Sequence, residues 1–252
     1  MTAAPFPLIA AASILLFSQA VEADQAAVAV AANFTVPAQR LAAAFEVATG
    51  HTLQLSFGAT GKFYAQIING APFGALLAAD EVTPAKLETE GWGIAGSRFN
   101  YAQGRLVLWS RQADTVDSAG EILKGDYFHH LAIANPKLAP YGTAAFQVLE
   151  RLGLQNTLAP KLVEGENIGQ TFQFVATGNA ELGFVALSQL VGQPPGSRWL
   201  VPEELYSPII QQALLLTPGK SNEAAQGFLT YLKTEAARLI IEEYGYKVPF
   251  SK

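Results

Sequence analysis

The sequence predicts an α/β fold in which helices connect the strands of parallel sheets, arranged as one large or two medium domains. Between residues 27 and 245, short apolar runs alternate with segments of helical spacing, a pattern typical of strands joined by helical crossovers. Half of the 252 residues are hydrophobic and 15% are charged, so the chain can bury a large core. The sequence shows neither a heptad pattern nor a repeat of fixed period, which excludes coiled-coil and solenoid folds.

The first half of the chain predicts three strands that each lead into a helix. Pro37 falls in the first turn of the first helix, and Gly50 follows its last turn. A Gly-Ala-Pro stop at residues 70–72 ends the second helix, and Gly91 ends the third. The predicted elements are a strand from residue 27, a helix at 35–49, a strand at 52–57, a helix carrying Phe63 and Ile67, a strand at 75–79 and a helix that begins at Thr83-Pro84.

The second half continues the alternation. Asn167 is a typical helix cap, Gly153 and Gly178 are typical helix ends, and Ser221 is expected to cap a final helical region that reaches Gly245. Strands are predicted at 105–110, 131–134, 182–187 and 211–217, helices at 143–152 and 168–177, and a Pro- and Gly-rich loop at 189–208.

The N-terminus predicts an export signal over residues 1–23. An apolar run from Leu8 to Phe17 precedes a small-x-small ending, with cleavage expected after Ala23. Residues 1–7 contain no Lys or Arg, unlike most export signals, so an apolar N-terminal helix that stays attached is the alternative. The run is too short for a membrane span, and the chain has no cysteine to carry a lipid anchor.

Two strand-to-helix junctions predict an anion site. Residues 27–35 and 53–62 each lead from an apolar strand through small polar residues into an amphipathic helix. Each junction delivers unpaired backbone N–H groups to a helix N-terminus, where the helix dipole favours negative charge.

Several other functions are excluded or disfavoured by the composition. The net charge of −5 leaves no basic surface for nucleic acid, and the absence of cysteine removes thiolate nucleophiles and zinc–thiolate sites. The neighbours His129 and His130 would point to opposite faces of a strand and are poorly placed to share a metal. Residues 56–63 contain a Gly-Lys pair but lack the first glycine and the Ser/Thr of a nucleotide phosphate loop.

The remaining candidates are small neutral hydrogen-bonding groups at strand-to-helix junctions. Asn33, Thr60, Tyr141 and the Asn167-Ile168 turn are all read as lying at strand-to-helix junctions, beyond the carboxyl ends of strands, where open α/β sheets bind ligands. Taken singly, each also fits an ordinary role as a helix cap, turn or loop residue.

Read together and in order, these stretches resemble the molybdate-binding substrate-binding proteins of ABC transporters, over nearly all of the chain that follows residue 23. The matching stretches are Ala31-Ala32-Asn33-Phe34, Ser56-Phe57-Gly58-Ala59-Thr60, Gly70-Ala71-Pro72, Ala78-Ala79-Asp80, Gly104-Arg105-Leu106-Val107-Leu108, Asn135-Pro136, Pro140-Tyr141-Gly142, Glu166-Asn167-Ile168 and Leu182-Gly183-Phe184-Val185.

The resemblance implies a two-lobed periplasmic-binding-protein fold of the class II type. Each lobe would have a mixed, mostly parallel sheet flanked by helices, and two crossover strands would lie near 105–110 and 211–216. The implied limits are residues 1–23 for the signal peptide, 24–104 plus 212–252 for the first lobe and 105–211 for the second. It further implies a monomer in the periplasm that closes on one molybdate or tungstate ion and delivers it to a membrane permease, with no cofactor and no catalytic residue.

Carried over residue by residue, the resemblance implies that Asn33, Ala32, Thr60, Tyr141 and Ile168 hold the oxyanion. Ala32 and Ile168 would act through backbone N–H groups alone. Lys62, two positions after Thr60, is expected to point elsewhere and at most to attract anions.

This chain departs from the family pattern at three places. Many members have a Ser hydroxyl at the position of Ala32 or Asn33, and another at Thr60. Some have a Tyr at the position of Ala186, a role that Tyr141 would fill from the other side of the cleft. Gly74 replaces an acidic residue. The open alternatives are another ligand, such as sulfate, phosphate or an organic carboxylate, and an enzyme on the same scaffold.

Overall fold

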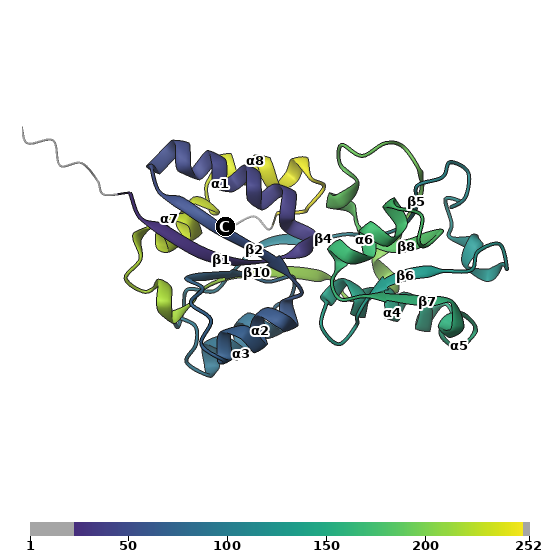
Figure 1. The fold of residues 1–252 in the computed structure, drawn as a ribbon, viewed down its shortest axis with the longest axis horizontal. Helices are drawn as coiled ribbons and strands as arrows, with labels where there is room; N and C mark the ends of the chain where they lie inside the picture. The colour runs from purple at the N-terminus through teal and green to yellow at the C-terminus, as the bar shows by residue number, and fades with distance from the viewer. Residues whose placement is uncertain (1–22, 249–252) are drawn as a thin grey trace, which may run out of the picture.

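The computed structural model describes residues 23–248, and these form two α/β lobes side by side along the long axis of the molecule (Figure 1). Residues 1–22 of the predicted signal peptide lie outside the described residues. Each lobe has its own five-stranded sheet, in the order β2-β1-β3-β10-β4 in the first lobe and β7-β6-β8-β5-β9 in the second. Within residues 23–248 no helix has the length and apolar character needed to cross a membrane.

The first lobe is formed by two separate parts of the described chain, one before the first crossing and one after the second. Its strands are β1 (Gln25–Ala31), β2 (Thr52–Gly58), β3 (Ala75–Leu77), β4 (Phe99–Gly104) and β10 (Ile209–Leu215). Its helices are η1 (Ala32–Phe34), α1 (Thr35–Thr49), α2 (Thr60–Ile68), α3 (Val82–Thr89), η6 (Thr217–Gly219), α7 (Glu223–Tyr231) and α8 (Glu235–Glu243).

The second lobe is formed by the middle of the chain. Its strands are β5 (Leu106–Ser110), β6 (Leu131–Ala134), β7 (Leu162–Gly165), β8 (Leu182–Ala186) and β9 (Ser197–Leu200). Its helices are η2 (Glu121–Lys124), α4 (Pro140–Arg151), α5 (Gln155–Leu158), η3 (Ala159–Lys161), α6 (Ile168–Ala176), η4 (Leu187–Leu190) and η5 (Glu203–Leu205).

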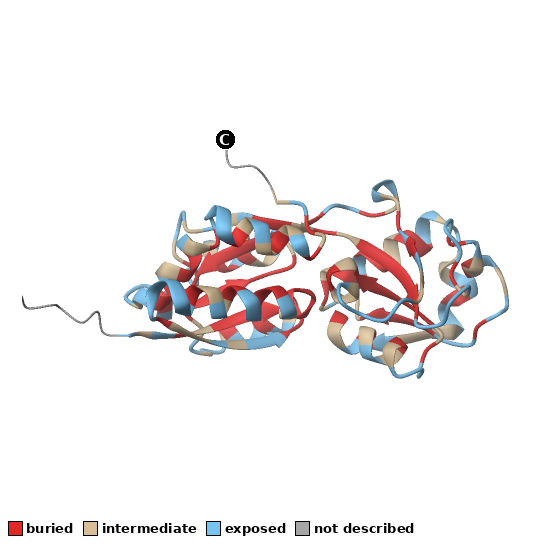
Figure 2. Ribbon diagram, turned by 90° about the horizontal axis from the view of Figure 1, so that it is seen from above, coloured by how far each residue is buried: buried red, intermediate tan, exposed pale blue. Residues whose placement is uncertain are grey.

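Each sheet is covered on both faces, which explains its continuous apolar strands. In β1, Val28 and Val30 pack with Phe45 of α1 and Phe228 of α7, whereas Ala29 faces α2 and α3 on the other side. The second sheet likewise divides its buried residues between α4 on one face and α6 on the other. Figure 2 shows the buried segments gathered along the two sheets. Strands buried on both faces read as apolar runs without alternation, as the sequence predicts.

Both sheets are mixed, as predicted, but their antiparallel share is larger than the sequence suggests. β1 pairs in parallel with β2 and β3, and β6 pairs in parallel with β7 and β8. The strands next to the lobe junctions, β10 and β5, pair antiparallel with both of their neighbours. The parallel strands run toward the junction between the lobes. Strands β5 and β10 each begin at that junction and run away from it, so they are antiparallel to their neighbours.

The chain passes between lobes at two places, and the second differs from the prediction. The first crossing is at Arg105, between β4 and β5. The second lies between Leu200 and Ile209, because residues 209–215 already belong to β10 of the first sheet. The predicted crossover at 211–216 was therefore placed too late, since Ile209 and Ile210 look like the end of a loop that contains Pro208.

Other predicted elements need correction. The predicted loop at 189–208 contains the edge strand β9, which follows Pro194-Pro195-Gly196 and pairs with β5. The predicted final helix is two helices, capped by Asn222 and Thr234 rather than by Ser221. Helix α4 begins at Pro140, not at Thr143, because proline is accepted in a first turn. Strands β4 and β7 were not predicted.

Candidate anion-binding site

All five residues predicted to bind an anion line one small cavity between the lobes. Ala32 and Asn33 follow β1, Thr60 begins α2, Tyr141 lies in the first turn of α4, and Ile168 begins α6. None of these residues is more than 8% exposed. The cavity has a volume of about 10 Å³, which is about that of one water-sized sphere. A cavity of this size suits a compact ion and has no room for an organic molecule.

The parallel strand pairs explain why these residues meet. Ala31 of β1 is in register with Gly58 of β2, and Ala134 of β6 is in register with Gly165 of β7. Parallel neighbours end at the same edge of a sheet, so the helices that follow them begin close together. The first N–H groups of a helix have no partner within it and carry the positive end of its dipole. Helical N-termini from both lobes therefore border the cavity.

The two hydroxyl groups of the site are each set up as hydrogen-bond donors. Thr60 Oγ1 accepts a hydrogen bond of 3.1 Å from the backbone N–H of Ala79. The Tyr141 hydroxyl accepts a longer one of 3.4 Å from Nε2 of Gln211. Because a protein donor already faces each oxygen, the single hydroxyl proton is left for a ligand. Burial raises the pKa of Tyr141 well above its usual value, so this hydroxyl keeps its proton.

The side-chain amide of Asn33 has no N–H left to donate to an anion. Its Nδ2 donates to Oε1 of Gln211 at 3.0 Å and to the Tyr246 hydroxyl at 2.9 Å, which occupies both amide hydrogens. Its Oδ1 is buried and has no hydrogen-bond partner among the described residues. The group of Asn33 that remains for an anion is its backbone N–H, at the start of η1.

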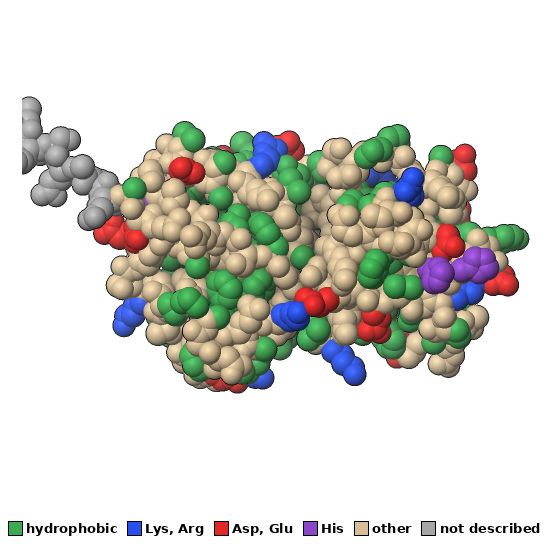
Figure 3. Space-filling view, viewed as in Figure 1, with side chains coloured by type: hydrophobic (Ala, Val, Ile, Leu, Met, Phe, Trp, Pro, Cys, Tyr) green, Lys and Arg blue, Asp and Glu red, His purple; other side chains and the backbone are tan. Residues whose placement is uncertain are grey.

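No charged side chain lines the cavity. Lys62, the cation nearest in sequence, forms an ion pair of 2.6 Å with Glu166, and both side chains are about half exposed. Figure 3 shows that few charged side chains lie along the seam between the lobes on the face in view. A bound anion would therefore be stabilised by oriented N–H and O–H groups rather than by a salt bridge. Within residues 23–248 no three His, Cys, Asp or Glu side chains are grouped to hold a metal cation.

Comparison with known proteins places this architecture in a family. The model of the family described as bacterial extracellular solute-binding protein matches residues 26–247. The chain belongs to this family. It is 55% identical to the molybdate-binding protein ModA of Azotobacter vinelandii, covering 95% of this chain and 96% of that protein. It is 51% identical to molybdate-binding protein ModA of Rhodobacter capsulatus, over 89% of this chain and 88% of that one.

A solved structure agrees with the sequence relatives. The periplasmic molybdate-binding protein of Azotobacter vinelandii superposes with a TM-score of 0.87 at 42% identity, covering 89% of this chain and all of that chain. The two-lobed solute-binding fold and the resemblance to molybdate-binding proteins, both inferred from ordered motifs, are thereby confirmed.

Besides the Gln211–Tyr141 and Tyr246–Ser188 hydrogen bonds, three contacts join the lobes around the cavity in this solute-binding protein. The N–H of Gly61 donates to the carbonyl of Leu138 at 2.9 Å, and Ser188 Oγ donates to the carbonyl of Asn33 at 2.8 Å. The Lys62–Glu166 pair is the third. Each contact must break when the lobes separate.

The Lys62–Glu166 pair is expected to slow release of the anion. Replacing both residues, as Lys62→Gln with Glu166→Gln, keeps the net charge and should raise the dissociation rate of molybdate roughly two- to fivefold, the range of exposed ion pairs. Stopped-flow dissociation at low and high salt measures this effect, which salt should abolish. The matched control is Lys86→Gln with Glu90→Gln, an ion pair within the first lobe. An equal change in both double variants would contradict the expectation.

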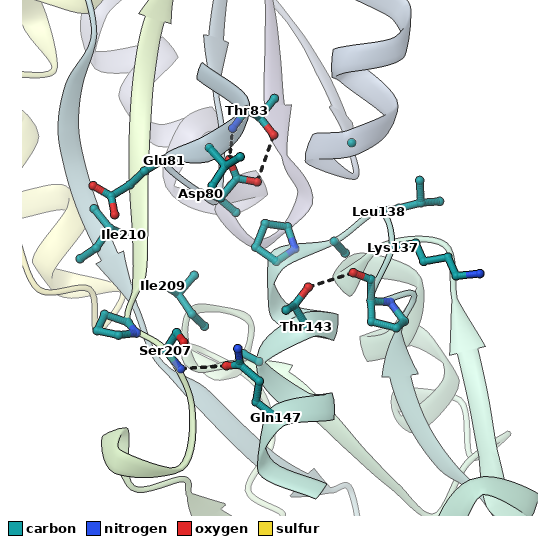
Figure 4. Close-up of a pocket in the computed structure, with 18 residues that line it drawn as sticks. Asp80, Glu81, Thr83, Lys137, Leu138, Thr143, Gln147, Ser207, Ile209 and Ile210 are labelled. Atoms are coloured by element: carbon teal, nitrogen blue, oxygen red, sulfur yellow. Dashed lines mark hydrogen bonds between the residues drawn. The ribbon is translucent and has the colours of Figure 1, made fainter. Parts of the chain in front are cut away.

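A larger groove of about 360 Å³ lies next to the cavity between the lobes (Figure 4). Asp80, Glu81 and Thr83 line it from the first lobe, and Lys137 and Gln147 line it from the second. The Asp80 carboxylate accepts hydrogen bonds from the N–H and the hydroxyl of Thr83, and burial raises its pKa. Two carboxylates and one lysine make this groove unsuited to an anion, so the small cavity is the better candidate.

The buried groups behind the site were missed from the sequence. Gln211, Tyr101, Tyr246 and Ser188 are all buried and form a hydrogen-bonded network with Asn33. One signal was available. Gln211 and Gln212 interrupt the apolar strand of residues 209–215, and buried polar groups require partners.

Proposed function

We propose that this protein captures molybdate or tungstate in the interlobe cavity and delivers it to the permease of an ABC transporter. The observation that carries the proposal is a buried, uncharged cavity bordered by helix N-termini and by two hydroxyls whose oxygens already accept protein hydrogen bonds. The molybdate-binding relatives at 55% and 51% identity support the choice of ion.

The chemistry of the cavity matches a fully deprotonated oxyanion. Such an ion only accepts hydrogen bonds, and each charge-assisted bond contributes about 1.5–3 kcal/mol. Several such bonds together offset the cost of removing the ion from water. The proposed donors are the backbone N–H groups of Ala32, Asn33 and Ile168 and the hydroxyls of Thr60 and Tyr141.

The proposal includes the setting in which the protein works. It is exported, its signal is cleaved near Ala23, and it acts as a periplasmic monomer that binds and releases its ion without chemical change. Molybdate and tungstate are proposed together because both are tetrahedral oxyanions of the same charge. The membrane permease is the proposed partner, and nucleic acid is not.

Titration calorimetry of the chain from residue 24 onward tests the choice of ion. We expect tight binding of molybdate and tungstate, and binding of sulfate and phosphate weaker by at least tenfold. The proposed contacts of the cavity are all hydrogen-bond donors, so the proton of hydrogen phosphate would find no acceptor among them. Tighter binding of phosphate or sulfate than of molybdate would overturn the proposal in favour of another oxyanion.

A further inference from the structure

The Tyr141 hydroxyl, which belongs to the second lobe, lies against two strands of the first lobe, close to where the chain crosses between the lobes. One is β4, whose last residue, Gly104, precedes the first crossing at Arg105. The other is β10, which begins just after the second crossing and carries Gln211. The strands pair antiparallel, with Gly104 opposite Ile209 and a bulge after Gln211.

Gly104 leaves the space that the hydroxyl occupies. A Cβ atom at this position would lie 2.0 Å from the Tyr141 hydroxyl oxygen, 2.9 Å from its ring carbon Cζ and 2.8 Å from Nε2 of Gln211. These distances are shorter than real contacts allow, so any side chain at residue 104 must displace Tyr141 or Gln211.

Gln211 is itself held in one orientation. It is fully buried, and its Oε1 accepts hydrogen bonds from the Tyr101 hydroxyl at 2.8 Å and from Nδ2 of Asn33 at 3.0 Å. An amide has one acceptor end and one donor end. With two donors at Oε1, the Nε2 end faces the Tyr141 hydroxyl and donates to it.

We infer that Gly104 and Gln211 are positioning residues of the anion site. Gly104 admits the Tyr141 hydroxyl between the two strands, and Gln211 donates to its oxygen so that the hydroxyl proton is directed at the anion. This inference rests on the proposed function, because it requires Tyr141 to donate to the bound ion. It extends the site to two residues that do not line the cavity.

The opposite orientation of the amides makes a different prediction. If the amides of Gln211 and Asn33 were both reversed, Oε1 would face Tyr141 and take its proton, and Nδ2 of Asn33 would take the unpartnered position of Oδ1. In that arrangement Tyr141→Phe would leave molybdate affinity unchanged. The two orientations are therefore separable by binding measurements.

A double-mutant cycle between Gln211 and Tyr141 tests the inference, with molybdate as the probe. We expect Tyr141→Phe to weaken binding about tenfold or more. Gln211→Met should weaken binding at least fivefold in the natural background and have no further effect in the Tyr141→Phe background, because it acts through the hydroxyl. The matched control is Gln212→Met, since the neighbouring buried glutamine bonds to Arg98 and Asn100 instead.

Gly104→Ala tests the position of the Tyr141 hydroxyl without removing a hydrogen-bonding group. It therefore keeps the inference testable if the Gln211→Met protein does not fold. We expect it to weaken molybdate binding at least tenfold. Gly227→Ala is its control, because a Cβ there would lie an ordinary 3.4 Å from Phe45. Thermal unfolding of every variant identifies losses of affinity that come from misfolding.

The outcomes separate the inference from the proposed function. Equal weakening by Gln211→Met in both backgrounds, or unchanged affinity in Gly104→Ala, would overturn the positioning role and leave molybdate binding standing. Unchanged affinity in Tyr141→Phe would show that Tyr141 is not an anion ligand and would also overturn the inference. Failure of the unmodified protein to bind molybdate would overturn the proposed function itself.

Discussion

Thr60→Val is expected to weaken molybdate binding roughly 10- to 100-fold. The substitution keeps the shape of the side chain but removes the hydroxyl proton that the bonding pattern leaves for the ligand. A hydrogen bond to a charged group contributes about 1.5–3 kcal/mol, which corresponds to this range of affinity. Titration calorimetry measures the loss directly.

The same substitution has a second, separable effect on stability. Thr60 Oγ1 accepts the N–H of Ala79, and both residues are buried, so valine leaves that N–H without a partner. We expect the free energy of unfolding to fall by about 1–3 kcal/mol. Denaturant unfolding of the ligand-free protein measures this cost.

Thr60→Ser is the control, because serine can supply the same acceptor and the same donor. It should bind molybdate within a few-fold of the natural protein. If Thr60→Val bound molybdate as tightly as Thr60→Ser, the hydroxyl would not be an anion ligand.

Phe34→Ala is expected to lower the free energy of unfolding by about 3–5 kcal/mol, the usual range for a buried phenylalanine. Phe34 is fully buried and meets the rings of Tyr101 and Tyr246 edge to face, with centroids 4.9 and 5.2 Å away. Those two tyrosines carry hydroxyls of the network behind the anion site. The substitution should therefore also weaken molybdate binding.

Phe57→Ala is the matched control, since this phenylalanine of β2 is 36% exposed. We expect it to destabilise the protein clearly less than Phe34→Ala. Urea unfolding followed by circular dichroism gives both values. A similar loss for the two variants would contradict the role assigned to Phe34 in the core.

The sequence was informative where local signals and tertiary environment agree. Asn167 accepts the N–H of Gln170 and begins α6, and Gly50 ends α1 with a positive φ of 80°, both as predicted. Strands buried on two faces, such as Leu131–Ala134, were found because nothing interrupts their apolar runs. These signals act over a few residues, and a single sequence contains them.

Elements with weak local signals were missed. Strand β9 follows two prolines and a glycine, and it lies at the edge of its sheet, where it needs no continuous apolar run. Strand β4 has the sequence FNYAQG, in which Asn100 bonds to Gln212 and Tyr101 to Gln211, both on β10. Its strand conformation depends on pairing with a segment about a hundred residues later, which no local pattern reveals.

By itself, the sequence determined the α/β class, most of the strand-to-helix junctions and, through their order, the family and the five residues that line one cavity. These follow from helix N-termini and apolar runs, which depend on neighbours along the chain. The tertiary structure alone decided which atoms of those residues are free. The N–H of Ala79 donates to the hydroxyl oxygen of Thr60, and the amide of Gln211 donates to that of Tyr141. The side-chain amide of Asn33 donates to Gln211 and to Tyr246. The direction of a hydroxyl proton depends on the donor opposite it, and here those donors come from segments distant in sequence.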